Sequence, residues 1–152
     1  MNINKADFEK AKDNFFPAKN GFDGAKKALT EYAEPQINLA MHHFSVTLKY
    51  MLKIVCVKYN IAYSEYDNLA LLFAKTRRFL AGDILASDIL NMETEVLSWQ
   101  YYTNTSIKTA DEANEVGKIF EYFFNNVIRK FLSETKKSLE WQEDEFSGSG
   151  IF

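Results

Sequence analysis

The sequence predicts an all-α fold, an antiparallel four- to five-helix bundle with an additional N-terminal helical segment. Apolar residues recur at spacings of three and four along most of the chain, which is typical of amphipathic helices. The 152 residues include six glycines and two prolines, few enough to allow long uninterrupted helices. No segment alternates apolar and polar residues over the length of a strand, so the pattern favours helices throughout.

The composition supplies a core for one domain. Apolar residues make up 47% of the chain and aromatic residues 15%, with 13 phenylalanines as the main contribution. A chain of this length buries roughly two-thirds of its unfolded surface, which is enough for a core without disulfide bonds or metal ions. We therefore expect a single domain over residues 1–141. Residues 142–152, acidic and then Ser-Gly-Ser-Gly, are expected to form a flexible C-terminal tail.

The N-terminal segment is predicted to contain two helices. The first covers residues 4–16, where apolar residues have helical spacing. Pro17, Asn20 and Gly21 then predict a break, because proline lacks a backbone N–H and glycine has a low helix propensity. The second helix is expected from about Phe22 to Ala33, and Pro35 either ends it or opens the next helix.

Residues 36–59 give the clearest helix pattern, with apolar side chains on two nearly opposite faces. The first face, which suits the core, holds Ile37, Met41, Phe44, Leu48, Met51, Leu52 and Val55. A strip on the second face needs its own cover, because monomers tend not to expose contiguous apolar strips. We expect a homodimer contact there, formed by Leu39, His43, Val46, Tyr50 and Val57. The helices over residues 4–33 are the alternative cover.

Three more helices complete the expected bundle. One covers about 65–80, with Ser64 and Asp67 at the spacing of an N-terminal cap, and the next covers 84–103. The last opens at Thr109 and Glu112, which have the spacing of a capping box, and runs to about Lys137. Five residues on the inward faces are expected to be largely buried: Phe44, Leu48, Trp99, Phe120 and Phe123.

Charge and cysteine content limit the classes of partner. The net charge is −3 and the basic clusters are scattered, so tight, non-specific binding to duplex nucleic acid is not expected. Cys56 is the single cysteine, the N-terminus lacks a signal-peptide pattern, and the apolar runs are too short to span a bilayer. We expect a cytoplasmic protein with no membrane association.

The residues that most often carry chemistry do not form a catalytic motif. His42 and His43 are neighbours on one helix and point about 100° apart, so they cannot clamp one metal ion. We expect one solvated and one interfacial histidine. Cys56 lies beside an apolar face and suits an inert buried thiol. No phosphate-binding glycine loop and no zinc spacing occurs, so neither a metal ion nor another cofactor is expected.

The stretch from about Gln36 to Leu132 resembles the HEPN domain, a small helical bundle. His43-Phe44 followed by Leu48-Lys49-Tyr50-Met51-Leu52-Lys53 is similar to the first core helix of that family. Asp67-Asn68-Leu69-Ala70-Leu71-Leu72 is similar to the motif that opens its next helix. Tyr101-Tyr102-Thr103-Asn104, followed by Thr109 to Ala113, is similar to its loop and capped final helix. The resemblance covers about two-thirds of the chain.

Departures from the family pattern bear on activity. Ribonuclease members carry an Arg followed closely by a His near the last loop, whereas this chain has Tyr101 at the Arg-like position and no histidine after His43. Asp67 stands where a histidine usually opens the second motif, and Lys49 replaces an acidic residue. The resemblance implies the fold, a homodimer, and association with a nucleotidyltransferase-type protein or a nucleotide. It does not imply ribonuclease activity.

The leading hypothesis is therefore a non-catalytic, HEPN-like binding or interaction protein. The candidate ligand- or phosphate-binding residues are Lys49 and Lys53 on the 36–59 helix, Arg77 and Arg78 in the sharpest basic cluster, and Tyr101. One alternative is a metal-independent ribonuclease with displaced groups, in which His42 or His43 is the acid or base and Arg77 or Arg78 holds phosphate. The other alternative is a purely structural interaction domain.

Overall fold

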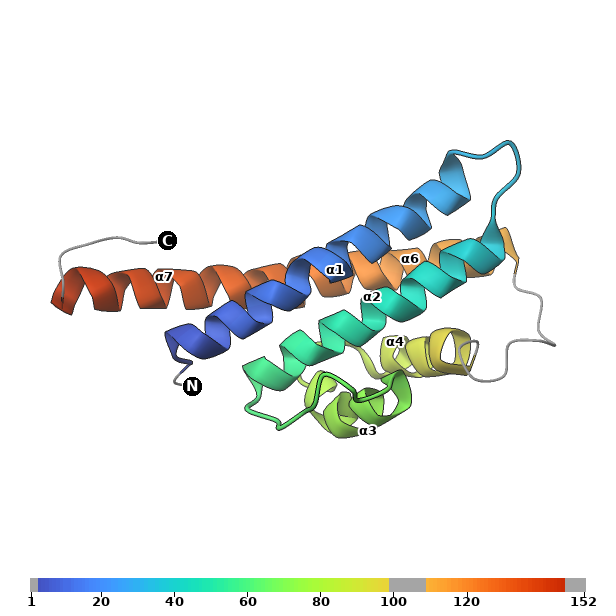
Figure 1. The fold of residues 1–152 in the computed structure, drawn as a ribbon. Coiled ribbons are helices and arrows are strands. Elements are labelled where there is room, and N and C mark those ends of the chain that lie inside the picture. Colours follow the sequence, from blue (N-terminus) through green and yellow to red (C-terminus); the bar gives the residue numbers. More distant parts are fainter. Residues whose placement is uncertain (1–2, 99–108, 147–152) are drawn as a thin grey trace.

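The computed structural model describes residues 3–98 and 109–146, with side chains as far as residue 140 (Figure 1). Six α-helices lie in these ranges: α1 (Lys5–Thr30), α2 (Ile37–Lys58), α3 (Leu69–Leu80), α4 (Ala86–Asn91), α6 (Ala110–Phe123) and α7 (Arg129–Phe146). Two π-helical segments continue them, η1 (Met92–Leu97) after α4 and η2 (Phe124–Ile128) between α6 and α7. No strand occurs in the described ranges, and the all-α fold is confirmed.

The helices pack around α2. α1 and α2 form a long antiparallel pair, and α6 with α7 runs alongside both, with the end of α7 projecting past the bundle (Figure 1). The short helices α3 and α4 lie together on another side of α2. The core residues of α2 are fully buried in this arrangement, among them Met41, Phe44, Leu48, Met51, Leu52 and Val55. The core face expected for this helix is therefore confirmed.

The expected break in the N-terminal segment is wrong, because α1 is one continuous helix of 26 residues with Pro17 inside it. An internal proline costs about 3 kcal/mol or more, so packing must stabilise the helix across this point. A stripe of small residues supplies that packing: Ala11, Ala18, Gly21, Ala25 and Ala28, all buried. Glycine at position 21 allows close approach to α2, since an added Cβ would lie 2.3 Å from Thr47 Oγ1. Gly21, which was expected to help end a helix, instead allows α1 and α2 to pack closely.

Local hydrogen bonds set the other helix starts. α3 begins later than expected, at Leu69, because Asn68 is its cap and accepts a hydrogen bond from the Leu71 N–H at 2.9 Å. The expected Ser64–Asp67 pair instead closes a turn, in which the Ser64 N–H donates to Asp67 Oδ2 at 3.1 Å. The capping box of the last helix is confirmed: the Glu112 N–H donates to Thr109 Oγ1, and Glu112 Oε1 accepts from the Thr109 N–H.

The last helix is longer than the sequence pattern indicates. Through η2 it continues into α7, which ends at Phe146 and so includes residues 142–146, expected to belong to the tail. Four of the five expected core residues, Phe44, Leu48, Phe120 and Phe123, are fully buried, and the fifth, Trp99, lies outside the described residues. None of the helices in the described part of the chain is long and apolar enough to cross a bilayer.

Candidate functional site

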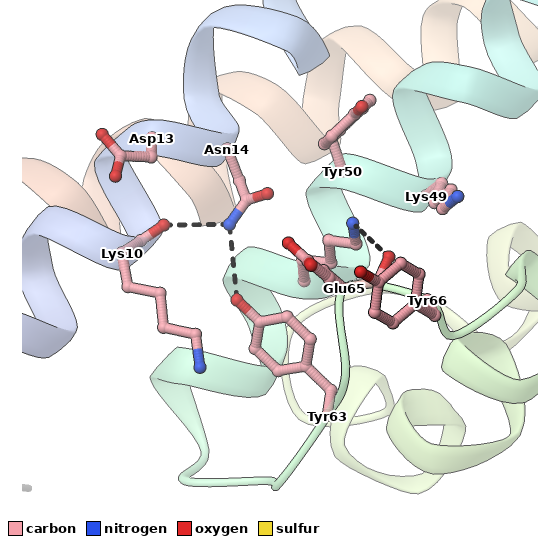
Figure 2. Close-up of a pocket in the computed structure, with 9 residues that line it drawn as sticks. Lys10, Asp13, Asn14, Lys49, Tyr50, Tyr63, Glu65 and Tyr66 are labelled. Carbon is pink, nitrogen blue, oxygen red and sulfur yellow. Dashed lines mark hydrogen bonds between the residues drawn. The ribbon is translucent and has the colours of Figure 1, made fainter.

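A groove of about 580 Å³ lies between α1, α2 and the connection that follows α2. Its polar lining concentrates two kinds of side chain, as Figure 2 shows. Three lysines (Lys10, Lys49, Lys53) and three tyrosines (Tyr50, Tyr63, Tyr66) line it together with Asp13, Asn14 and Glu65. We call it the Lys–Tyr groove.

Helical spacing and the antiparallel pairing of α1 with α2 bring these residues together. Lys49 and Lys53 are four residues apart and therefore share one face of α2. Lys10 and Asn14 have the same spacing on α1 and form the opposite wall. The connection over residues 59–68 closes the third side. It leaves α2 through Asn60, whose positive φ of 55° suits asparagine better than most residues.

Lys53 is the most enclosed cation of the groove. Its residue is only 6% exposed, and its Nζ donates to the backbone carbonyl of Glu65 at 3.4 Å and lies 5.0 Å from the centre of the Tyr50 ring. Burial lowers the pKa of the Lys53 amine, because the charged form loses hydration, and Lys49 lowers it further by charge repulsion. The carboxylates of Glu65 and Asp67 act in the opposite direction.

The tyrosines form a second part of the lining. The Lys10 Nζ lies 4.4 Å from the centre of the Tyr63 ring, and the Tyr63 hydroxyl oxygen accepts a hydrogen bond from Asn14 Nδ2 at 3.4 Å. Burial raises the pKa of the Tyr63 hydroxyl, although the Asn14 hydrogen bond opposes the shift. Tyr66 is 86% exposed and stands at the rim, a position from which its ring is free to contact a bound molecule.

Ion pairing holds the 59–68 connection against α3. Lys75 Nζ donates to Asp67 Oδ2 at 2.6 Å and to the Ala62 carbonyl at 3.2 Å. The hydrogen bonds from Lys75 and from the Ser64 N–H lower the pKa of the Asp67 carboxyl, because both favour its charged form. The wall that carries Tyr63 and Tyr66 is thereby fixed at its far end.

The structure brings together only some of the candidate ligand-binding residues. Lys49 and Lys53 both line the groove. Arg77 instead pairs with Glu93, and the Arg78 guanidinium lies 4.7 Å from the centre of the Phe79 ring. Tyr101 lies outside the described residues. The sequence pattern missed the six groove residues outside α2, which belong to α1 and to the connection after α2: Lys10, Asp13, Asn14, Tyr63, Glu65 and Tyr66.

The strip expected to form a homodimer contact is partly covered within the chain. Leu39 is 41% exposed, whereas Val46, Tyr50 and Val57 are half-buried. The ring of His43 lies against α1, where an added Cβ on Gly24 would meet it at 3.0 Å. α1 therefore covers one side of the strip, as in the alternative that the sequence left open, and the Leu39 side stays accessible.

The two histidines and Cys56, the residues considered for chemistry, all lie in the described ranges. His42 is exposed and His43 packs between helices, and no polar contact in these ranges joins either to Arg77 or Arg78. Burial raises the pKa of the Cys56 thiol to about 11, so it stays protonated at neutral pH. Within residues 3–98 and 109–140, no group of three or more histidine, cysteine, aspartate or glutamate side chains could hold a metal ion.

The lining of the groove is suited to bind a small molecule. It offers cations for an anionic group and aromatic faces for a planar ring, with Asp13 and Glu65 as the opposing charges. Comparison with family models, with curated proteins and with solved structures found no match to this chain.

Proposed function

We propose that this protein is a non-catalytic, HEPN-like helical binding protein that takes a nucleotide in the Lys–Tyr groove. The observation that carries the proposal is the convergence of three lysines and three tyrosines on one cavity. A nucleotide joins an anionic phosphate to a planar base. Lysine ammonium groups bind phosphate oxygens, and tyrosine rings stack on bases.

The size and the local charge favour a single nucleotide over a nucleic acid. The cavity of about 580 Å³ falls within the range of small-molecule sites, roughly 300–1,000 Å³. The two carboxylates in the lining and the net charge of −3 oppose a long polyanion, whose phosphates would extend over the surrounding surface. A single nucleotide is short enough for its phosphate to contact the groove lysines without extending over the surrounding surface.

Isothermal titration calorimetry of the purified chain with AMP and ATP tests this function. We expect saturable binding that weakens when Lys10 or Lys49 is changed to Ala, because each removes a cation from the lining. Lys118→Ala is the matched control, since Lys118 is exposed on α6 and pairs with Glu115. Absence of binding at millimolar nucleotide, or equal weakening by Lys118→Ala, would contradict the proposal.

We also propose a homodimer formed through the accessible part of the α2 strip. Leu39 and Val46 are the apolar residues that support it, because both retain exposure at the outer face of α2. A two-fold contact would place this patch against its copy. Tyr50 belongs both to this strip and to the groove lining, so dimer formation and ligand binding would share one residue.

A further inference from the structure

Lys53 differs from the other enclosed lysines in forming no ion pair with any residue in the described part of the chain. Lys58 and Lys75 are also partly buried, but each forms an ion pair, with Asp83 at 2.9 Å and with Asp67 at 2.6 Å. Among the described residues, the polar contacts of Lys53 are one long hydrogen bond to the Glu65 carbonyl and the face of the Tyr50 ring. A carbonyl accepts a hydrogen bond from a neutral amine as well as from an ammonium group.

The charged groups around Lys53 do not return the pKa of its amine to the ordinary value. Lys49 lies one turn away on α2, Glu65 and Asp67 belong to the 59–68 connection, and Lys10 and Asp13 line the groove from α1. Loss of hydration is the largest effect and lowers the Lys53 pKa, and Lys49 adds to it. At neutral pH, Lys53 therefore has a larger neutral fraction than an exposed lysine. The neutral amine is the nucleophilic form.

We propose that Lys53 forms an imine with a small phosphorylated aldehyde bound in the Lys–Tyr groove. The inference rests on the proposed function, because the same lysines and tyrosines would hold the phosphate and the ring of the ligand. Lys53 lines the groove and is only 6% exposed, so a molecule in the groove would lie beside this side chain, to which bulk water has little access. Lys10 and Lys49, which are more exposed, hold the anionic group as cations.

The reaction needs no reagent beyond the aldehyde. The lone pair of the neutral Nζ attacks the carbonyl carbon, the C=O π electrons move to oxygen, and one N–H proton passes to that oxygen. The hydroxyl of the resulting carbinolamine then leaves with the remaining N–H proton as one water molecule, which leaves a C=N bond. Nothing is oxidised or reduced, and water reverses the step.

Pyridoxal 5′-phosphate is a suitable probe because it combines an aldehyde, a phosphate and a planar ring. The full-length protein is incubated with the probe at neutral pH and treated with borohydride, which converts an imine into a stable amine. Peptide mass spectrometry then locates the label. We expect Lys53 to carry several-fold more label than any other described lysine.

Two variants test the assignment. Lys53→Arg keeps the positive charge but cannot form the imine, so most of the label should disappear. Lys58→Arg is the matched control on the same helix and should retain the label. Circular dichroism checks the fold of both variants. If Lys53→Arg does not fold, label mapping on the wild-type chain still decides the question, because it needs no substitution.

A label spread over lysines in proportion to their exposure would overturn the inference, as would a label unchanged by Lys53→Arg. Titration with pyridoxine 5′-phosphate, which has an alcohol in place of the aldehyde, separates this failure from failure of the proposed function. If the alcohol binds saturably but the aldehyde forms no imine, the proposed binding site stands and Lys53 is rejected as its nucleophile. No binding of either compound or of nucleotides would reject both.

Discussion

Gly21 and Thr47 meet where α1 packs closely against α2. An added Cβ on Gly21 would lie 2.3 Å from Thr47 Oγ1, and that hydroxyl donates a hydrogen bond to the Ala18 carbonyl at 3.2 Å. The absence of a side chain at Gly21 leaves room for the Thr47 hydroxyl, and this hydroxyl links α2 to α1 through its hydrogen bond.

This fit predicts different effects of Gly21→Ala in two backgrounds. In the wild-type chain, overpacking costs about 1–3 kcal/mol, more than the helix propensity gain of about 1 kcal/mol, so the free energy of unfolding should fall. In a Thr47→Ala background the Oγ1 clash is absent and the remaining close contact is the His43 carbonyl oxygen at 3.2 Å, so Gly21→Ala should cost less than in the wild-type chain. Urea denaturation of the four proteins measures this coupling. Equal effects in both backgrounds would mean that Thr47 does not set the helix spacing.

Phe120 packs edge-on against Phe44 in the core, with ring centres 5.1 Å apart. Phe120→Ala should lower the free energy of unfolding by about 3–5 kcal/mol, because the cavity cannot fully collapse. Tyr122→Ala is the control two residues away, since Tyr122 is 49% exposed; it should cost less than about 0.5 kcal/mol. A loss below about 1 kcal/mol for Phe120→Ala would show that the core face of α6 is misplaced.

Tyr59 predicts a loss of stability in alkali. Burial and the 2.5 Å hydrogen bond to Asp83 raise the pKa of its hydroxyl from 10.0 to about 12. The folded state keeps this proton where the unfolded state has lost it, so the contribution is complete below pH 10 and is lost as pH rises toward 12. Tyr59→Phe should reduce the slope of stability against pH in this window. Tyr32→Phe, at an exposed tyrosine, should leave the slope unchanged; a slope that Tyr59→Phe also leaves unchanged would refute the assignment.

His43 predicts a second pH dependence, on the acid side. Burial against α1 and the neighbouring His42 lower its pKa below 6.5. The unfolded state then binds more protons than the folded state, so the stability present above pH 6.5 is lost as pH falls through this value toward the folded pKa. Thermal unfolding should show a smaller acid loss for His43→Gln than for His42→Gln. The reverse order would contradict the assignment to His43.

The proposed homodimer is tested by Leu39→Glu combined with Val46→Glu. Neither residue lines the groove, so the pair should break the dimer while nucleotide binding and helical circular dichroism are retained. Analytical ultracentrifugation measures whether the chain is a monomer or a dimer. The protein concentration should be tens of micromolar, on the order of the dissociation constant of a weak dimer. A wild-type chain that is monomeric under these conditions would contradict the homodimer proposal.

Sequence periodicity predicted the features that are set by residues within a single helix. The core face of α2 and the capping box of α6 follow from residues within one or two turns of each other, and both are confirmed. Lys49 and Lys53 were identified for the same reason, since four residues separate them on α2. Periodicity could not predict that Lys10 lines the same groove as Lys53, because that depends on how α1 pairs with α2. It misjudged Gly21, whose role comes from a neighbouring helix rather than from local propensity.

The continuity of α1 has a consequence for where this protein can be cut. A fragment that begins at residue 36 would keep α2 to α7, yet it would expose the Thr47 hydroxyl and the face of α2 on which the alanines of α1 rest. It would also lose Lys10, Asp13 and Asn14, one entire side of the groove. We therefore expect α2 to α7 not to fold as an independent unit, and a fragment made to test ligand binding in this groove has to include α1.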